Sequence, residues 1–102
     1  LLPTPWFFNH EMALALRGVR AVPLPCRAEN GFLPDPERAA ALVGPRTRAV
    51  VLVTPNNPTG AVMPPELIGR FADLCREHGL WLVLDETYRD FLPEGQDTPH
   101  GL

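Results

Sequence analysis

The 102-residue sequence contains no lysine, and all nine of its basic residues are arginine. Its two cysteines, Cys26 and Cys75, lack the spacing of metal ligands, so we expect free thiols in a reducing compartment and not a disulfide. No apolar run is long enough to cross a bilayer, and no signal peptide is recognisable at the N-terminus. These absences predict a cytoplasmic protein that does not bind membranes.

An excess of positive charge is also missing. The net charge is −3 and the arginines form no basic stripe, which argues against a nucleic-acid-binding protein. Apolar residues make up 45% and charged residues 21% of the chain, as in ordinary globular domains. The 13 prolines are scattered as turn and helix-start markers. We therefore expect residues 1–102 to belong to a single domain.

Short β-type runs alternate with segments of helical period. Residues 49–53 (AVVLV) and 80–84 (LWLVL) are continuous apolar runs, which are typical of strands buried on both faces of a parallel sheet. Shorter strands are predicted to end at Leu2 and to cover residues 20–24. Residues 92–102 carry Pro, Gly, Gln and Asp and are predicted to form a loop.

Three helices are predicted between these strands. The first covers residues 8–17 and ends at Gly18, and the second follows Asp35, a suitable N-cap before a proline, and runs to Val43. The third opens at Pro64, and one apolar stripe along it is predicted to be buried: Leu67, Phe71, Leu74 and Cys75. This alternation predicts an α/β fold with three layers (αβα) and a mostly parallel sheet.

Unusual residues follow three of the predicted strands. Residues 3–8 (PTPWFF) follow the first strand, residues 54–60 (TPNNPTG) follow AVVLV, and residues 85–88 (DETY) follow LWLVL. Ligands of open α/β sheets bind at the carboxyl ends of the strands. We therefore expect the three loops to open at the same edge of the sheet.

Each loop also has a purely structural interpretation. NPTG is a favourable reverse turn, because proline fixes φ and glycine accepts a positive φ. The aromatic residues 6–8 could pack in the core, Asp85 could cap a following turn, and Tyr88 could be a half-buried aromatic with a satisfied hydroxyl. Taken together, however, an aromatic ring, an amide, a carboxylate and a phenol describe a site for a flat, polar, heteroaromatic ligand.

The string VTPNNPTGAV, followed 28 positions after Asn57 by the aspartate of LVLDETY, resembles the class I and II aminotransferases of pyridoxal-phosphate (PLP) fold type I. The opening PTPWFFNHEMALALRG is similar to the segment of those enzymes that carries the aromatic residue stacked on the cofactor ring. The two motifs at this separation, each after an apolar run, are more specific than either alone. The resemblance covers residues 3–91 and implies a central part of the large PLP-binding domain.

The resemblance implies a set of cofactor-binding residues. Asp85 matches the aspartate that pairs with the protonated ring nitrogen of PLP and makes the ring an electron sink. Asn57 and Tyr88 match the residues that hydrogen-bond the phenolic oxygen of the ring. Trp6 matches the stacking aromatic, with the two adjacent phenylalanines as alternatives.

The resemblance also implies what this chain lacks. The Schiff-base lysine is absent, so no catalytic residue is assigned, and we expect a fragment that does not catalyse transamination by itself. The full-length protein is expected to be a homodimeric aminotransferase that moves an amino group between an amino acid and a 2-oxo acid. His10, His78 and His100 show no metal-like grouping and are given no role.

Three other functions remain open. Another PLP reaction of fold type I, such as that of a β-lyase or a decarboxylase, uses the same ring-binding residues. A PLP-sensing domain of a transcription regulator would carry the same module behind a DNA-binding domain. A non-catalytic α/β scaffold would keep the shape of the family without its chemistry.

Overall fold

The computed structural model describes residues 1–92, and residues 93–102, which include most of the predicted C-terminal loop and His100, lie outside this range. The strands of the described part are β1 (Leu2–Thr4), β2 (Pro23–Pro25), β3 (Ala49–Val53) and β4 (Trp81–Asp85). Its α-helices are α1 (Phe8–Leu16), α2 (Pro36–Leu42) and α3 (Pro65–His78). Two short 3-10 helices, Ala28–Asn30 and Arg89–Phe91, complete the list of elements. No helix of residues 1–92 is both long and apolar enough to span a membrane.

Both strand pairs of the described residues are parallel. β1 pairs with β2, and β3 pairs with β4 with Val53 opposite Asp85. Leu1 connects the two pairs, because its nitrogen donates to the carbonyl of Ala49 (2.7 Å) and its carbonyl accepts from the amide of Val51 (3.0 Å). The structure thus has two two-stranded parallel sheets, β1–β2 and β3–β4, which Leu1 joins edge to edge in the order β2–β1–β3–β4. The carboxyl ends of all four strands therefore lie at one edge.

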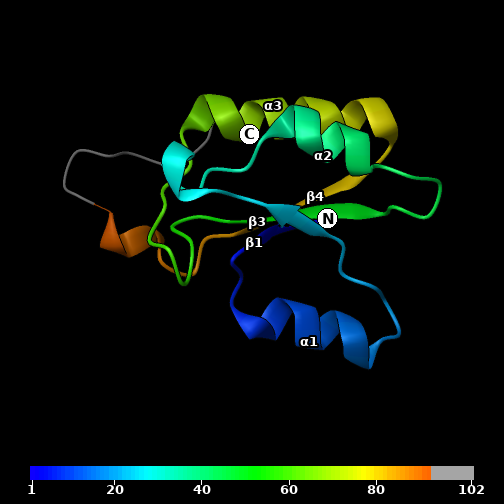
Figure 1. Ribbon diagram of the computed structural model, residues 1–102, viewed down its shortest axis with the longest axis horizontal. Helices are drawn as coiled ribbons and strands as arrows, with labels where there is room; N and C mark the ends of the chain where they lie inside the picture. Colours follow the sequence, from blue (N-terminus) through cyan, green and yellow to red (C-terminus); the bar gives the residue numbers. More distant parts are fainter. Residues whose placement is uncertain (93–102) are drawn as a thin grey trace.

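Helices lie on both faces of this sheet. α2 and α3 run side by side over one face, and α1 lies beneath the other (Figure 1). This arrangement confirms the predicted three-layer α/β fold with a parallel sheet.

One face of α3 supplies much of the core. Its buried residues are Ile68, Phe71, Leu74 and Cys75. They cluster with Val50 and Leu52 of β3, whose side chains are fully buried. The prediction placed Leu67 in the buried stripe, but Ile68 takes that place and Leu67 is only partly buried. Residues 68, 71 and 75 are spaced i, i+3 and i+7, which turns them toward the sheet together.

The prediction that β4 is buried on both faces was wrong. Trp81 is 78% exposed and Val83 is 45% exposed, whereas Leu82 and Leu84 pack against the core under α3. Alternate side chains of a strand point to opposite faces, so Trp81 and Val83 share the face on which α1 lies. No residue of α1 is buried, and this helix therefore does not cover them.

Local signals placed several element boundaries correctly. The side chain of Asp35 accepts a hydrogen bond from the amide of Glu37 (2.9 Å), which confirms its role as the N-cap of α2. Gly18 follows the end of α1 with φ +65°, a conformation that glycine adopts without steric cost. The strand predicted at residues 20–24 is observed as β2, which is shorter and lies further along the chain, at Pro23–Pro25. Its pairing with β1 begins where the amide of Leu2 donates to the carbonyl of Val22 (3.0 Å), and it ends with β1 at Thr4.

Candidate functional site

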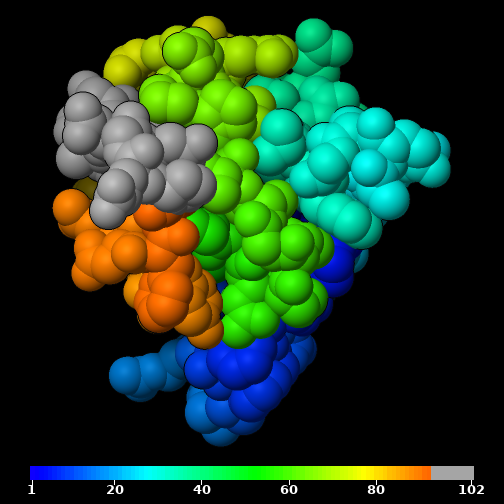
Figure 2. Space-filling view, turned by 90° about the vertical axis from the view of Figure 1, so that its left-hand side faces the viewer, coloured from blue at the N-terminus to red at the C-terminus, as the bar shows by residue number. Residues whose placement is uncertain are grey.

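The three loops predicted to share one edge of the sheet do so. Figure 2 looks onto this edge, where the segments after β3 (green) and β4 (orange) lie beside the segment after β1 (blue). Side chains tie them together: the amide of Asn56 donates to the carbonyl of Pro5 (3.4 Å), and the amide of Asn57 donates to the hydroxyl of Tyr88 (3.3 Å). The parallel topology of β1, β3 and β4 therefore gathers the polar residues as expected.

The loop after β3 is a tight, internally bonded turn. Its base is closed by fully buried Thr54, whose hydroxyl accepts from the amide of Met63 (3.0 Å). Within it, Gly60 has φ +73° and its amide donates to the carbonyl of Asn56 (2.7 Å). The structural interpretation of NPTG as a turn is thus correct. The same turn holds Asn57 at the edge of the sheet, so the structural and the functional interpretations are compatible.

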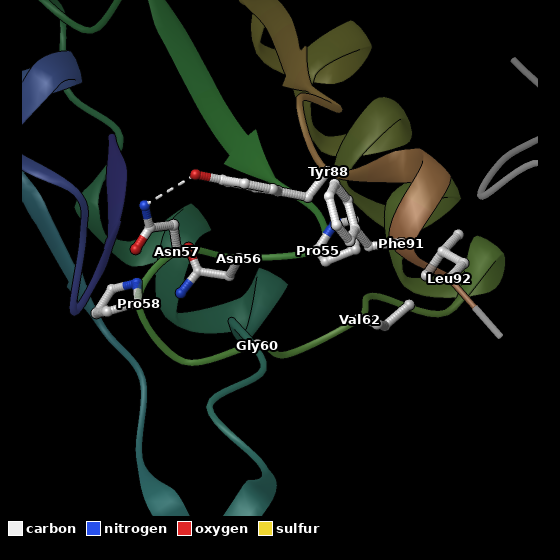
Figure 3. Close-up of a pocket in the computed structure, with 9 residues that line it drawn as sticks. All are labelled: Pro55, Asn56, Asn57, Pro58, Gly60, Val62, Tyr88, Phe91 and Leu92. Atoms are coloured by element: carbon white, nitrogen blue, oxygen red, sulfur yellow. Dashed lines mark hydrogen bonds between the residues drawn. The ribbon is translucent and has the colours of Figure 1, made fainter.

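Asn57 and Tyr88 line a pocket of about 620 Å³ between the loop after β3 and the turn after β4 (Figure 3). Their side chains point toward one another across the upper part of this pocket (Figure 3). The amide of Asn57 keeps a second N–H, and the phenol of Tyr88 keeps its own proton while it accepts from Asn57. Both groups can therefore donate to a single ligand oxygen placed between them.

Asp85, the last residue of β4, lies on the same strand face as Trp81 and points toward α1. One carboxylate oxygen, Oδ2, lies 2.8 Å from Nε2 of His10. The other, Oδ1, accepts from the amide (3.0 Å) and the hydroxyl (2.6 Å) of Thr87. The prediction that Asp85 could cap a turn is thus correct for one of its two oxygens.

These hydrogen bonds hold the pKa of Asp85 below its ordinary value of 3.8. The Thr87 hydroxyl contributes most; partial burial opposes it, and the Thr87 amide and His10 add to the lowering. Asp85 is therefore a carboxylate at neutral pH. A carboxylate only accepts hydrogen bonds, so Nε2 is the ring nitrogen of His10 that carries a proton in this contact.

His10 and Thr87 were not identified from the sequence. His10 was given no role because it has no metal-like grouping, yet it sits in the first turn of α1, at the edge of the sheet where Asp85 ends β4. Thr87 follows Asp85 by two positions, the spacing at which an aspartate side chain bonds its own backbone. The Thr87 signal was present in the sequence, whereas the role of His10 depends on which face of the sheet α1 lies against.

Trp6 lies between two residues that contact the other loops. Pro5 accepts from Asn56, and His10 bonds Asp85, so the intervening segment is anchored at both ends. Trp6 is half-buried. Phe7 and Phe8 have ring centroids 4.5 Å apart and are 37% and 57% exposed, so the interpretation of these two rings as core packing was wrong.

Comparison with known proteins relates this site to one family. The model of the family described as aminotransferase class I and II matches residues 1–101. The chain is 41% identical over 96 residues to an arginine–pyruvate transaminase of Pseudomonas aeruginosa, a match that covers 94% of this chain and 24% of the relative. It is 41% identical over 93 residues to an aspartate/prephenate aminotransferase of Thermus thermophilus, with 91% of this chain and 24% of the relative covered.

Solved structures give the same result. The structure of aspartate aminotransferase from Thermus thermophilus with maleate superposes with a TM-score of 0.88 at 40% identity, over 92% of this chain and 25% of that one. An aromatic aminotransferase from Pyrococcus horikoshii also gives 0.88, at 33% identity, over 99% of this chain and 26% of that one. The chain thus spans about a quarter of the length of the proteins it matches. It belongs to the class I and II aminotransferase family.

Proposed function

We propose that the full-length protein is a PLP-dependent aminotransferase and that this segment of its large domain holds the cofactor ring. The observation that carries the proposal is the ionised carboxylate of Asp85, fixed at the carboxyl edge of the sheet by His10 and Thr87. On the same edge, Asn57 and Tyr88 form a pair of donors. Groups of this kind suit a flat ring that carries a protonated nitrogen and an acceptor oxygen.

By chemical type, these groups match the polar atoms of PLP: Asn57 and Tyr88 line the pocket, and Asp85 and Trp6 lie outside its lining on the same edge. Asp85 accepts from the protonated ring nitrogen, and Asn57 and Tyr88 donate to the phenolic oxygen of the ring. Trp6, half-buried on the anchored segment after β1, would stack on the ring face. A carboxylate and a cation attract each other more strongly in a partly buried site than in water. This attraction favours the protonated form of the ring.

PLP, when bound, supplies an electron-withdrawing ring that stabilises negative charge on a substrate carbon. The task of this chain is to keep the ring electron-poor and in place. Asp85 keeps a proton at the ring nitrogen, and His10 keeps Asp85 aimed toward the α1 side of the sheet. Asn57 and Tyr88, as a pair of donors, would stabilise charge on the phenolic oxygen and help to orient the ring.

The names of the relatives support transamination over other PLP reactions. Arginine–pyruvate transaminase, aspartate/prephenate aminotransferase and glutamate–pyruvate aminotransferase all match over at least 90% of this chain. We infer an amino acid and a 2-oxo acid as the substrates. A homodimer in the cytoplasm is part of the same proposal, and the two free cysteines of the described residues agree with a reducing compartment.

The proposal is tested in the full-length protein with the isosteric variant Asp85→Asn. Loss of a charge-assisted hydrogen bond costs about 1.5–3 kcal/mol, so we expect the dissociation constant for PLP to rise roughly 10- to 150-fold. The absorbance of bound PLP should change as well, because the ring nitrogen loses the group that holds its proton. Both quantities are measured by titrating the cofactor-free protein with PLP.

Asp73→Asn is the matched control. Asp73 is an exposed carboxylate of α3 that pairs with Arg76. Its loss should leave both quantities unchanged, since surface pairs of this kind contribute little. Unchanged PLP affinity and absorbance in Asp85→Asn would refute the assignment of Asp85 and, with it, the proposed site.

A further inference from the structure

The two oxygens of the Asp85 carboxylate are not equivalent. Oδ1 accepts two hydrogen bonds, both from Thr87, and Oδ2 accepts one, from His10. Each carboxylate oxygen has two lone pairs. Both lone pairs of Oδ1 are therefore used by Thr87, and Oδ2 keeps one lone pair for a further donor.

We propose that Thr87 is a positioning residue: its hydroxyl occupies Oδ1 of Asp85, leaves Oδ2 as the acceptor for a ligand, and so determines where the proton lies between Asp85 and the cofactor ring. This inference rests on the proposed function, because it takes the ligand of Asp85 to be the PLP ring nitrogen. It goes further by naming a residue that acts through Asp85 without itself touching the ring.

The chemistry of the hydrogen bonds supports this role. A donor to a carboxylate makes it a weaker base, and the Thr87 hydroxyl is the largest of the influences that lower the pKa of Asp85. A weaker base leaves a shared proton nearer to its partner. With Thr87 in place, the proton stays on the ring nitrogen, and the ring keeps its positive charge.

Other groups around Asp85 leave this role to Thr87. α1 contributes His10, whose hydrogen bond and charge are the smallest of the influences that lower the Asp85 pKa. β3 and residues 54–63 carry no ionisable side chain; next to Asp85 they contribute backbone, through the pairing of Val53 with Asp85 and through Thr54, whose amide donates to the Asp85 carbonyl (3.0 Å). The segment after β4 carries further ionisable residues, Glu86, Tyr88, Arg89 and Asp90, and none of them is among the influences on the pKa of Asp85.

The test uses the full-length protein loaded with PLP that is labelled with nitrogen-15 at the ring nitrogen. Thr87→Val removes the hydroxyl but keeps the backbone amide that holds Oδ1, so Asp85 stays in place as a stronger base. We expect the nitrogen-15 resonance to move downfield, toward the value of an unprotonated ring. A less positive ring is a poorer electron sink, so kcat should fall roughly 3- to 10-fold with KM nearly unchanged.

Two further variants make the test specific. Thr87→Ser restores the hydroxyl and should return both the resonance and kcat to the wild-type values. Thr47→Val removes a hydroxyl that accepts from the amide of Gly44 (2.9 Å), away from the candidate site, and should leave the resonance unchanged. A resonance that does not move in Thr87→Val, that moves upfield, or that is not restored by serine overturns the role of Thr87.

Failure of this inference is distinguishable from failure of the proposed function. Asp85→Asn serves as the reference, because it removes the carboxylate itself. If Asp85→Asn weakens PLP binding and Thr87→Val leaves the resonance unchanged, Asp85 holds the ring without help from Thr87. If Asp85→Asn has no effect on PLP binding, the site assignment fails, and the role of Thr87 fails with it.

Discussion

Thr54 links the sheet to the loop that carries Asn57, and the hydrogen bond that its hydroxyl accepts can be removed by a single substitution. The residue is fully buried at the end of β3, and its Oγ1 accepts from the amide of Met63, which is itself 3% exposed. Thr54→Val keeps the shape of the side chain but removes the acceptor. A buried donor left without a partner costs about 1–3 kcal/mol. The base of the loop that spans residues 54–63 should be destabilised by this amount.

Native-state hydrogen exchange in the full-length protein measures this effect at one amide. A loss of about 1–3 kcal/mol corresponds to exchange at Met63 that is roughly 5- to 150-fold faster. Thr54→Ser keeps the acceptor and should leave the rate close to that of the wild type. PLP affinity should fall in the valine variant, because Asn57 is presented by the same loop. An unchanged exchange rate at Met63 in Thr54→Val would refute the view that this hydroxyl closes the loop.

Three further predictions concern the core and the candidate site. Phe71→Ala opens a cavity at a fully buried residue and should lower the free energy of unfolding by about 3–5 kcal/mol. Phe91→Ala changes a residue that is 82% exposed and should alter this free energy by less than about 0.5 kcal/mol. Chemical denaturation of the full-length protein compares the two variants. Tyr88→Phe removes the acceptor of the Asn57 amide at the surface, so stability should change by less than about 1 kcal/mol while the absorbance of bound PLP shifts. The folded-state pKa of Asp85 is lowered, so its charge stabilises the fold above pH 3.8, and this contribution disappears as the pH falls through the folded-state pKa. Between about pH 5 and about pH 3, the urea midpoint of unfolding should therefore fall less in Asp85→Asn than in the wild type.

Much of the fold follows from local signals. The apolar run at residues 49–53 became β3, and the N-cap Asp35 opens α2, because both depend on neighbours in the sequence. The burial of β4 was not predictable in the same way. An apolar run shows that a strand prefers burial, but the exposure of Trp81 depends on how far α1 extends beneath the sheet. That distance is set by tertiary packing, which no local pattern records.

The candidate site shows the same division. Topology alone predicted that the segments carrying Trp6, Asn57 and Asp85 would meet at one edge, since the carboxyl ends of parallel strands lie together. The contact between His10 and Asp85 joins residues 75 positions apart and needs the first turn of α1 to face the end of β4. Sequence spacing gives no measure of that orientation. The structure shows this orientation, and it shows His10 as a partner of the Asp85 carboxylate that the sequence did not reveal.

Asp85 also shows why a structural and a functional interpretation of one residue need not compete. A carboxylate has two oxygens, and the turn after β4 uses only one of them, through the amide and hydroxyl of Thr87. This turn fixes the side-chain torsion and lowers the basicity of the group, which are the two properties that a partner for a protonated ring requires. The cap therefore prepares the second oxygen for a ligand. A residue such as Asp85 is better judged by counting which of its lone pairs the fold leaves free than by choosing between the two roles.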